Sequence, residues 1–136
     1  MIAIIAEKPS VGQEIARVVG ATEKKDGYIT GNGYMVTWAL GHLVSLALPG
    51  TYGYTRTTAE DLPMLPEPFR LVERQIRTDR GMVTDIAAGK QLKIIDEVFS
   101  KCDSIIVATD AGREGELIFR WIYSHLGCTK PFKRLW

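Results

Sequence analysis

The sequence predicts an α/β domain built around parallel strands, and three features of the chain lead to this prediction. Two short apolar runs without polar alternation, residues 1–6 and 104–109, are typical of strands buried on both faces of a parallel sheet. Segments with helical periodicity follow these runs, and alternation of strands with helices is the pattern of an α/β sheet. A length of 136 residues, 46% of them hydrophobic, suits one domain spanning residues 1–136.

The first helix is predicted just after the first strand. Residues 7–10 form the turn between them, and the helix is expected over about 11–19. Ser10 is the expected N-cap, because a serine hydroxyl can accept from the free N–H groups of the first turn. Gly20 is expected to end the helix.

The middle of the chain predicts a hairpin and a long loop. Residues 27–30 and 34–38 read as two strands around the glycine-rich turn 31–33. Residues 49–68 carry most of the prolines and several Tyr and Thr residues without a clear period, which predicts a long ordered loop. A short strand is expected over 69–73.

The last third predicts two helices around the second buried strand. A long amphipathic helix is expected over about 80–102, followed by the strand 104–109. The core candidates of that helix are Ile86, Ile94, Ile95, Val98 and Phe99. A second helix is expected over 113–126, ended by Gly127, and residues 133–136 begin one more strand.

Charge, cysteine content and hydropathy limit the functional classes. Seventeen Lys and Arg against sixteen Asp and Glu give a net charge of +1, so any contact with DNA must be local or shared with other parts of a larger protein. Cys102 and Cys128 lack metal-binding spacing and are expected to be reduced thiols of a cytosolic protein. No run approaches the roughly 20 apolar residues of a membrane span, so we expect a soluble intracellular protein.

Acidic side chains follow both buried strands. Glu7 comes after the first strand and Asp110 after the second, and active groups gather at the carboxyl ends of parallel strands. Glu114 lies four residues beyond Asp110, so a helix that begins near Gly112 would let both lean over the same edge. A few hard oxygen ligands with room for water and phosphate suit Mg²⁺. Each carboxylate taken alone could equally be a helix cap or a first-turn residue.

Five segments carry a resemblance to a known family. Residues 5–11 (IAEKPSV) resemble the opening motif of topoisomerase III, and residues 108–118 (ATDAGREGELI) resemble its second Toprim motif. Residues 41–43 (GHL), 61–66 (DLPMLP) and 134–136 (RLW) are similar to further segments of that family, in order and at fitting spacing. The chain therefore resembles the Toprim domain of a type IA DNA topoisomerase. This resemblance implies a small, mostly parallel sheet with helices on both faces.

The resemblance also implies an activity. In type IA enzymes a tyrosine on another domain attacks a DNA phosphodiester, giving a 5′-phosphotyrosyl link and a free 3′-hydroxyl. Strand passage and religation then relax negative supercoils or unlink DNA without ATP. None of the five tyrosines resembles that nucleophile's motif, so the chain is expected to hold half of an active site and to be inactive alone. Its expected partners are single-stranded DNA, the remaining domains of the same enzyme and a helicase, in the cytoplasm at the nucleoid.

The resemblance assigns roles to the acidic residues and to one lysine. It implies that Glu7 is the general acid/base serving the 3′-oxygen and also a Mg²⁺ contact, with Lys8 neutralising charge on the scissile phosphate. Asp110 and Glu114 match the first and last acids of the family's Asp-x-Asp-x-Glu pattern. Gly112 stands where many relatives have the middle aspartate, which puts a second metal site in doubt. The first site then depends on Glu7, Asp110 and Glu114.

Several other side chains have two open interpretations. His42 is either a DNA-backbone contact or a satisfied turn residue. Arg113 either contacts DNA phosphate or braces Glu114 in a salt bridge, and Glu116 is expected to be structural. Tyr52 and Tyr54 of the long loop either stack on single-stranded bases or pack on another domain. Lys8 could also be a solvated surface lysine.

Three rival functions share part of this pattern. Primases, small nucleases and recombination-repair proteins carry a Toprim acidic motif, but lack Glu7-Lys8-Pro9-Ser10 so near the N-terminus with Gly41-His42-Leu43 after it. A non-catalytic, flavodoxin-like signalling domain that binds Mg²⁺ or phosphate is expected to carry an acidic pair after the first strand. In this chain Glu7 is the single acidic residue there. A purely structural α/β domain leaves the acidic strand ends unexplained.

Overall fold

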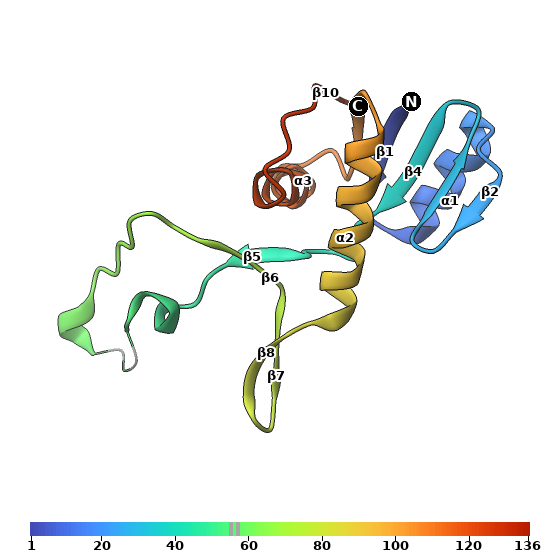
Figure 1. Cartoon of the computed structure of the whole chain (residues 1–136). Helices are drawn as coiled ribbons and strands as arrows, with labels where there is room; N and C mark the ends of the chain where they lie inside the picture. Colours follow the sequence, from blue (N-terminus) through green and yellow to red (C-terminus); the bar gives the residue numbers. More distant parts are fainter. Residues whose placement is uncertain (55, 57) are drawn as a thin grey trace.

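The computed structural model, which describes residues 1–54, 56 and 58–136, confirms the α/β prediction (Figure 1). Its centre is a six-stranded sheet in the order β10-β9-β1-β4-β3-β2. The strands are β1 (Ile2–Ala6), β2 (Glu23–Lys25), β3 (Tyr28–Gly31), β4 (Tyr34–Trp38), β9 (Ser104–Ala108) and β10 (Phe132–Arg134). β10, β9, β1 and β4 are parallel neighbours, whereas β2 and β3 form an antiparallel edge. The sheet is therefore mostly parallel.

The predicted hairpin is present as β3 and β4. Asn32 and Gly33 form its two-residue turn with φ angles of 49° and 83°. Asparagine and glycine accept positive φ at low cost, and this turn geometry matches the twist of the paired strands. The sequence did not predict β2, whose three residues are all exposed and extend the hairpin at the sheet edge.

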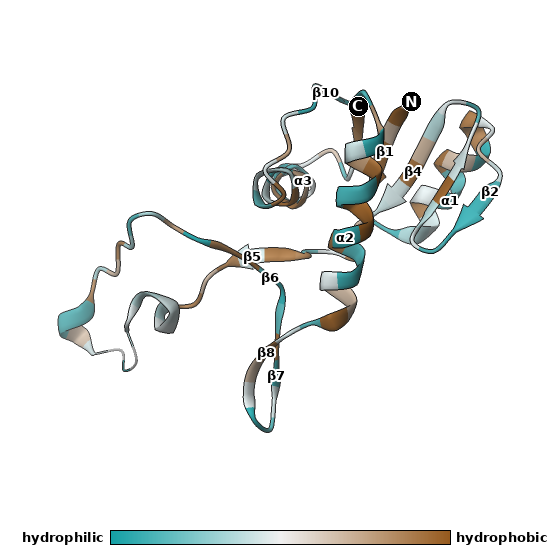
Figure 2. Ribbon diagram, viewed as in Figure 1, coloured by the Kyte–Doolittle hydropathy of each residue, from teal (hydrophilic) through white to brown (hydrophobic). Residues whose placement is uncertain are grey.

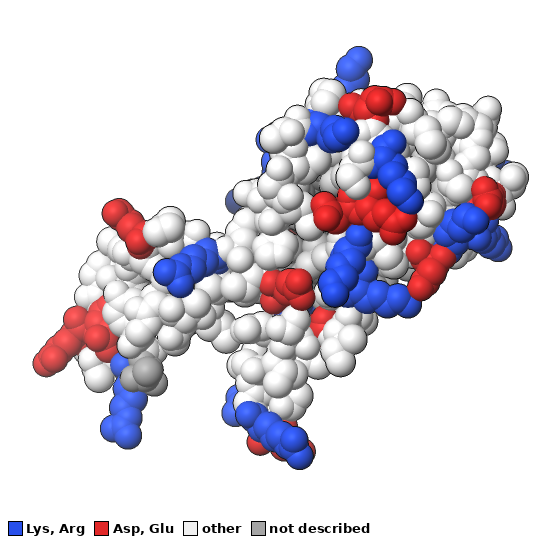
Figure 3. Space-filling model, in the orientation of Figure 1, with Lys and Arg blue, Asp and Glu red and all other residues white. Residues whose placement is uncertain are grey.

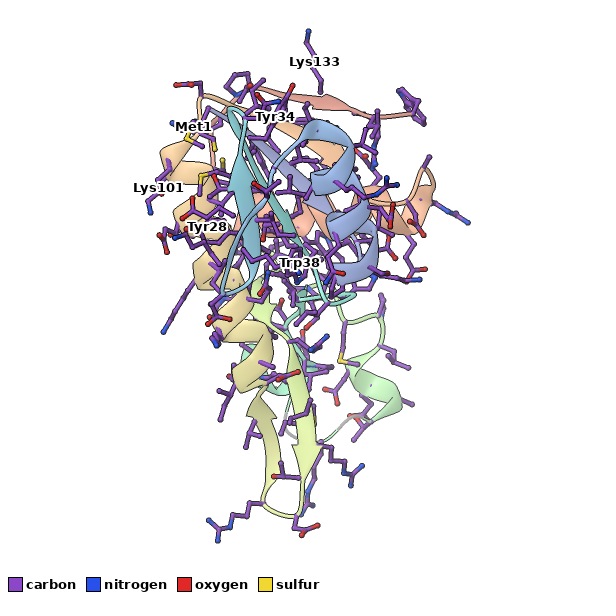
Figure 4. The ribbon with its side chains drawn as sticks, turned by 90° about the vertical axis from the view of Figure 1, so that its right-hand side faces the viewer. Met1, Tyr28, Tyr34, Trp38, Lys101 and Lys133 are labelled. Atoms are coloured by element: carbon purple, nitrogen blue, oxygen red, sulfur yellow. The ribbon has the colours of Figure 1, made fainter. Side chains whose placement is uncertain are left out.

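Helices cover both faces of the sheet. α1 (Pro9–Val19) packs on one face, and α2 (Ile86–Lys101) and α3 (Arg113–His125) pack on the other. Figure 4 shows α1 and α2 on opposite sides of β4, with Trp38 at the carboxyl end of that strand. Hydrophobic residues line β1 and part of α2 (Figure 2). Burial on both faces accounts for the unbroken apolar runs of β1 and β9.

Two predicted helix starts were wrong. The N-cap of α1 is Lys8, with Pro9 in the first turn, because the ring fixes a helical φ and the missing N–H costs nothing there. α2 begins at Ile86 because Asp85 caps it, accepting from the N–H groups of Ala87 and Ala88. Ile86 is 87% exposed and belongs to no core.

The residues before α2 form a hairpin of their own. β7 (Gln75–Thr78) and β8 (Gly81–Thr84) pair in antiparallel fashion, and β8 lies where the sequence had predicted the first turn of the helix. Of the other predicted core residues of α2, Ile95, Val98 and Phe99 are buried and Ile94 packs against them partly exposed.

A separate two-stranded sheet lies at the base of an extended arm, which is the segment between β5 (Val44–Leu46) and β6 (Leu71–Glu73). β5 pairs with β6, the strand expected near 69–73. Between them the described residues hold only the short 3₁₀ turns Pro49–Tyr52 and Ala59–Asp61, in line with the predicted long loop. Figure 1 shows this arm and the β7–β8 hairpin projecting from the body of the sheet. Among the described residues, no helix is long and apolar enough to cross a bilayer, and both cysteines are free thiols.

Candidate active site

Glu7 and Asp110 lie together at the carboxyl ends of neighbouring parallel strands. Ala6, the last residue of β1, stands beside Ala108 of β9, so the residues after each strand emerge at one edge of the sheet. The main-chain N–H of Asp110 donates a hydrogen bond to Oε2 of Glu7 over 3.2 Å. Glu7 is half-buried and Asp110 is exposed. The Glu7 carboxylate therefore lies against the main chain of Asp110, and both acidic residues stand at the same edge of the sheet.

A tight turn joins Asp110 to α3. The N–H of Gly112 donates to the carbonyl oxygen of Asp110 over 2.8 Å, and Gly112 is the N-cap of the helix. Its φ of −162° is extended backbone that any residue adopts, and an added Cβ would meet no atom within 4 Å. The backbone does not require glycine here, so the position is open to a larger side chain.

Gly115, in contrast, is required by close packing. An added Cβ at this position would overlap the carbonyl oxygen of Asp110. The hydroxyl of buried Thr109 donates to the carbonyl oxygen of Gly115 over 2.7 Å. These contacts fix the first turn of α3 against the end of β9, and with it the backbone of Asp110.

Arg134 ties β10 to the same junction. Its Nη1 donates to the carbonyl oxygen of Thr109 over 2.6 Å, and its Nε donates to Oε2 of Glu116 over 2.9 Å. Arg120 donates to the other oxygen of Glu116 over 2.7 Å. These hydrogen bonds, that of Arg120 foremost, hold the pKa of the Glu116 carboxyl below its usual range. Glu116 is thus structural, as expected.

The sequence had assigned no role to Thr109 or Arg134. A polar residue at the end of an apolar strand was the one available signal for Thr109. Arg134 stood in a segment that carried the family resemblance, but nothing local indicated its contacts across 25 residues of chain to Thr109.

Glu114 is paired with His42. Its Oε1 lies 3.1 Å from Nε2 of His42, and the two side chains are 78% and 33% exposed. The pair joins the start of α3 to the turn before β5. In the part of the chain that the structure describes, no three His, Cys, Asp or Glu side chains are grouped so that they could hold a metal ion. Glu7 and Asp110 are brought together, while Glu114 faces a different partner.

Arg74 donates hydrogen bonds to the backbone of the turn that carries His42. Nη1 of Arg74 donates to the carbonyl oxygens of Leu40 and His42 over 2.8 and 3.2 Å. Its Nε donates to Oδ2 of Asp85 over 2.8 Å. The Arg74 hydrogen bond, with those of the helix N–H groups, holds the pKa of the Asp85 carboxyl below its usual range. The N-cap of α2 therefore also positions His42.

Two cations flank the acidic edge. Lys8 follows Glu7 directly and is exposed at the N-cap of α1. Arg113 is exposed at the first position of α3. Among the described residues no carboxylate lies within ion-pair distance of Arg113, since His42 occupies the Glu114 carboxylate that the sequence offered as its partner. Both side chains are accessible to an anionic ligand.

The donor set suits a hard divalent cation such as Mg²⁺. This ion accepts oxygen ligands, often binds through one or two carboxylates, and completes its shell with water and substrate phosphate. Glu7 and Asp110 supply two carboxylates from rigid strand ends, and Glu114 stands within the first turn of α3. The arrangement is an open acidic edge and not a closed cage.

Charge is mixed on the face of the molecule seen in Figure 3. Figure 3 shows Lys and Arg side chains interspersed with Asp and Glu on the visible face, without a single basic stripe. This mixture agrees with the net charge of +1.

Comparison with known proteins places these features in a family. The sequence-family model of the Toprim domain matches residues 2–136 of the chain. The chain is 47% identical over 137 residues to DNA topoisomerase 3 of Bacillus licheniformis, and 46% identical over 138 residues to that of Shouchella clausii. It is 49% identical over 138 residues to DNA topoisomerase 3 of Bacillus cereus. Each match covers 98% of this chain but only 17% of the relative's length. The chain belongs to the Toprim domain family.

Proposed function

We propose that this chain forms the metal-binding half of the active site of a type IA DNA topoisomerase of the topoisomerase III kind. The observation that carries the proposal is the meeting of Glu7 and Asp110 at neighbouring strand ends, with the Glu7 carboxylate fixed by the Asp110 N–H. The names of the relatives support the choice of a topoisomerase over other Toprim enzymes.

Glu7 would act as the general acid in strand cleavage. A tyrosine hydroxyl from another domain attacks the phosphorus and loses its proton to solvent, the bond to the 3′-oxygen breaks, and Glu7 transfers its own proton to that oxygen. In religation the 3′-hydroxyl gives its proton to Glu7 as it attacks the phosphorus, the phosphotyrosyl bond breaks, and the released tyrosine oxygen takes a proton from solvent. The ammonium group of Lys8 would stabilise the charge that builds on the non-bridging oxygens.

Asp110 and Glu7 would hold Mg²⁺, with Glu114 as a further oxygen donor. Bound there, the ion would neutralise charge on the DNA phosphate next to the reacting bond. Engagement of Glu114 requires that its carboxylate leave His42. Its 78% exposure leaves room for that rotation.

The nucleophile must come from outside this chain. Tyr52 accepts a hydrogen bond from the Arg70 N–H in the arm, and Tyr123 donates to the Lys130 carbonyl oxygen. Tyr28 and Tyr34 pack against the two hydrophobic clusters of the sheet, and Tyr54 lines a hollow of the arm. These positions support the proposal that the chain alone neither cleaves nor relaxes DNA. The complete enzyme would act on single-stranded regions of the nucleoid in the cytoplasm, where a helicase could supply them.

A chimera tests the proposal. Residues 2–136 of this chain would replace the matching segment of Bacillus subtilis DNA topoisomerase 3, to which the chain is 45% identical. We expect the chimera to relax negatively supercoiled plasmid in Mg²⁺, and we expect Glu7→Gln to abolish relaxation. Glu14→Gln, on the exposed side of α1, is the matched control and should keep full activity.

The same experiment addresses the nearest alternative, a Toprim nuclease, primase or repair protein. A folded chimera that binds DNA but nicks it without religation would favour a nuclease. A folded chimera with no activity on plasmid would contradict the topoisomerase proposal.

A further inference from the structure

A groove runs beside the acidic edge, between α3 and the segment around β5. It encloses about 600 Å³ and is lined by His42, Ser45, Arg113, Glu114, Leu117 and Trp121. One wall is a stripe of α3: Arg113, Leu117 and Trp121 follow one another at intervals of four residues and so share a helix face. The groove therefore extends for about 12 Å along the helix, two turns at 1.5 Å per residue.

The far end of the groove is aromatic. The ring of Trp121 packs against the hydrophobic core with part of its surface exposed, which fixes its orientation. The His42 ring lies 5.6 Å from it at an interplanar angle of 59°. A tryptophan held rigidly by a core and open on one side is a platform on which a nucleobase can stack.

The near end is polar and lies next to the candidate metal site. Arg113 offers a guanidinium group with no carboxylate in ion-pair distance among the described residues, which suits a phosphate. Glu114, paired with His42, occupies the stretch between Arg113 and the aromatic end. The groove thus has a direction, with an anion favoured at Arg113 and an uncharged planar group favoured at Trp121.

We infer that this groove binds single-stranded DNA next to the cleavage site, with a phosphate at Arg113 and the base of a neighbouring nucleotide stacked on Trp121. The inference rests on the proposed function and adds a base-binding subsite to it. Stacking on one aromatic face tolerates any base, so the subsite positions the strand without reading its sequence.

Two probes of equal charge test the stacking. One is a short oligo-dT strand, and the other is an oligonucleotide of the same length with abasic residues. The protein carries Trp38→Phe and Trp136→Phe, so that Trp121 is the sole tryptophan fluorophore. At low salt, oligo-dT should quench Trp121 fluorescence, and the abasic strand should leave it unchanged.

Substitutions separate stacking from charge. Trp121→Ala should weaken oligo-dT binding about 5- to 150-fold, the range for loss of one base–aromatic stack, and leave abasic binding unchanged. Trp121→Phe keeps an aromatic ring and should retain most of the affinity for oligo-dT. This variant tests the stacking independently if the alanine variant fails to fold. Trp136→Ala, at an exposed tryptophan outside the groove, is the matched control and should bind both probes like the wild type.

Equal weakening of both probes by Trp121→Ala, or quenching by the abasic strand, would overturn the subsite. Absence of quenching by oligo-dT at saturation would overturn it as well. Each of these results leaves the topoisomerase proposal standing if the chimera relaxes plasmid, because that assay depends on Glu7 and not on Trp121.

Discussion

The carbonyl oxygen of Asp110 occupies the space in which a side chain at Gly115 would begin. This contact sets how closely α3 approaches the end of β9, and therefore where the Asp110 carboxylate emerges. A glycine five residues after Asp110 is thus a packing requirement of the candidate site.

Gly115→Ala should destabilise the domain. The added Cβ meets main-chain atoms that cannot rotate away, so the loss should reach or exceed the roughly 1–3 kcal/mol typical of overpacking. Urea denaturation followed by circular dichroism measures it. Gly50→Ala is the control, since its Cβ would meet nothing within 4 Å and should be neutral or slightly stabilising. Equal stability of both variants would show that the junction is loose.

Gly112→Asp should add a ligand to the acidic edge. The position has extended backbone and free space, and as the N-cap of α3 it should also gain a few tenths of a kcal/mol in stability. Gly112→Asn provides a similar cap without the charge. If the aspartate acts as a ligand, Mg²⁺ binding by calorimetry should be tighter in Gly112→Asp than in either Gly112→Asn or the wild type. Equal affinities would mean that the new side chain serves the helix only.

The Glu116 network should make stability depend on acid pH. Its carboxyl pKa lies below the ordinary value of 4.5 because Arg120 and Arg134 donate hydrogen bonds to it. The ionised carboxylate therefore adds to the free energy of unfolding above pH 4.5, and this stabilisation is lost as the pH falls through the lower pKa of the folded state. Glu116→Gln should lower the melting temperature at neutral pH, and this difference should vanish in strong acid. Glu14→Gln, at an exposed surface pair, should show little difference at any pH.

Arg113→Ala should weaken binding to single strands in a salt-dependent way. Loss of one phosphate contact lowers the slope of log affinity against log salt by about one. Fluorescence anisotropy over a range of salt concentrations measures the slope. Arg17→Ala, an arginine paired with Glu14 on α1, should leave it unchanged. An identical slope for wild type and Arg113→Ala would remove Arg113 from the DNA contact.

The central part of the fold was predictable because burial on both faces leaves a direct trace in the sequence. The apolar runs of β1 and β9 and the glycine after α3 fixed these elements to within a residue or two. The meeting of Glu7 and Asp110 followed from the geometry of parallel strands.

Other features depended on contacts that local sequence does not encode. Residues 75–84 were taken partly for helix, although Gly81 and the capping residue Asp85 favoured a later start. The pairing of Glu114 with His42 arises from the packing of α3 beside β5, across 72 positions of the chain. Periodicity carries no information about a contact of that kind.

The most direct measurement of the central claim is Mn²⁺-induced broadening of the amide NMR signals of this chain. A weak site is within reach of this method, and the signals nearest the bound ion broaden first. We expect broadening at Glu7, Lys8 and residues 110–114, lost in Asp110→Asn and Glu7→Gln but kept in Asp79→Asn at the tip of the β7–β8 hairpin. Unchanged broadening in Asp110→Asn would contradict the account, because Asp110 would then not be a metal ligand.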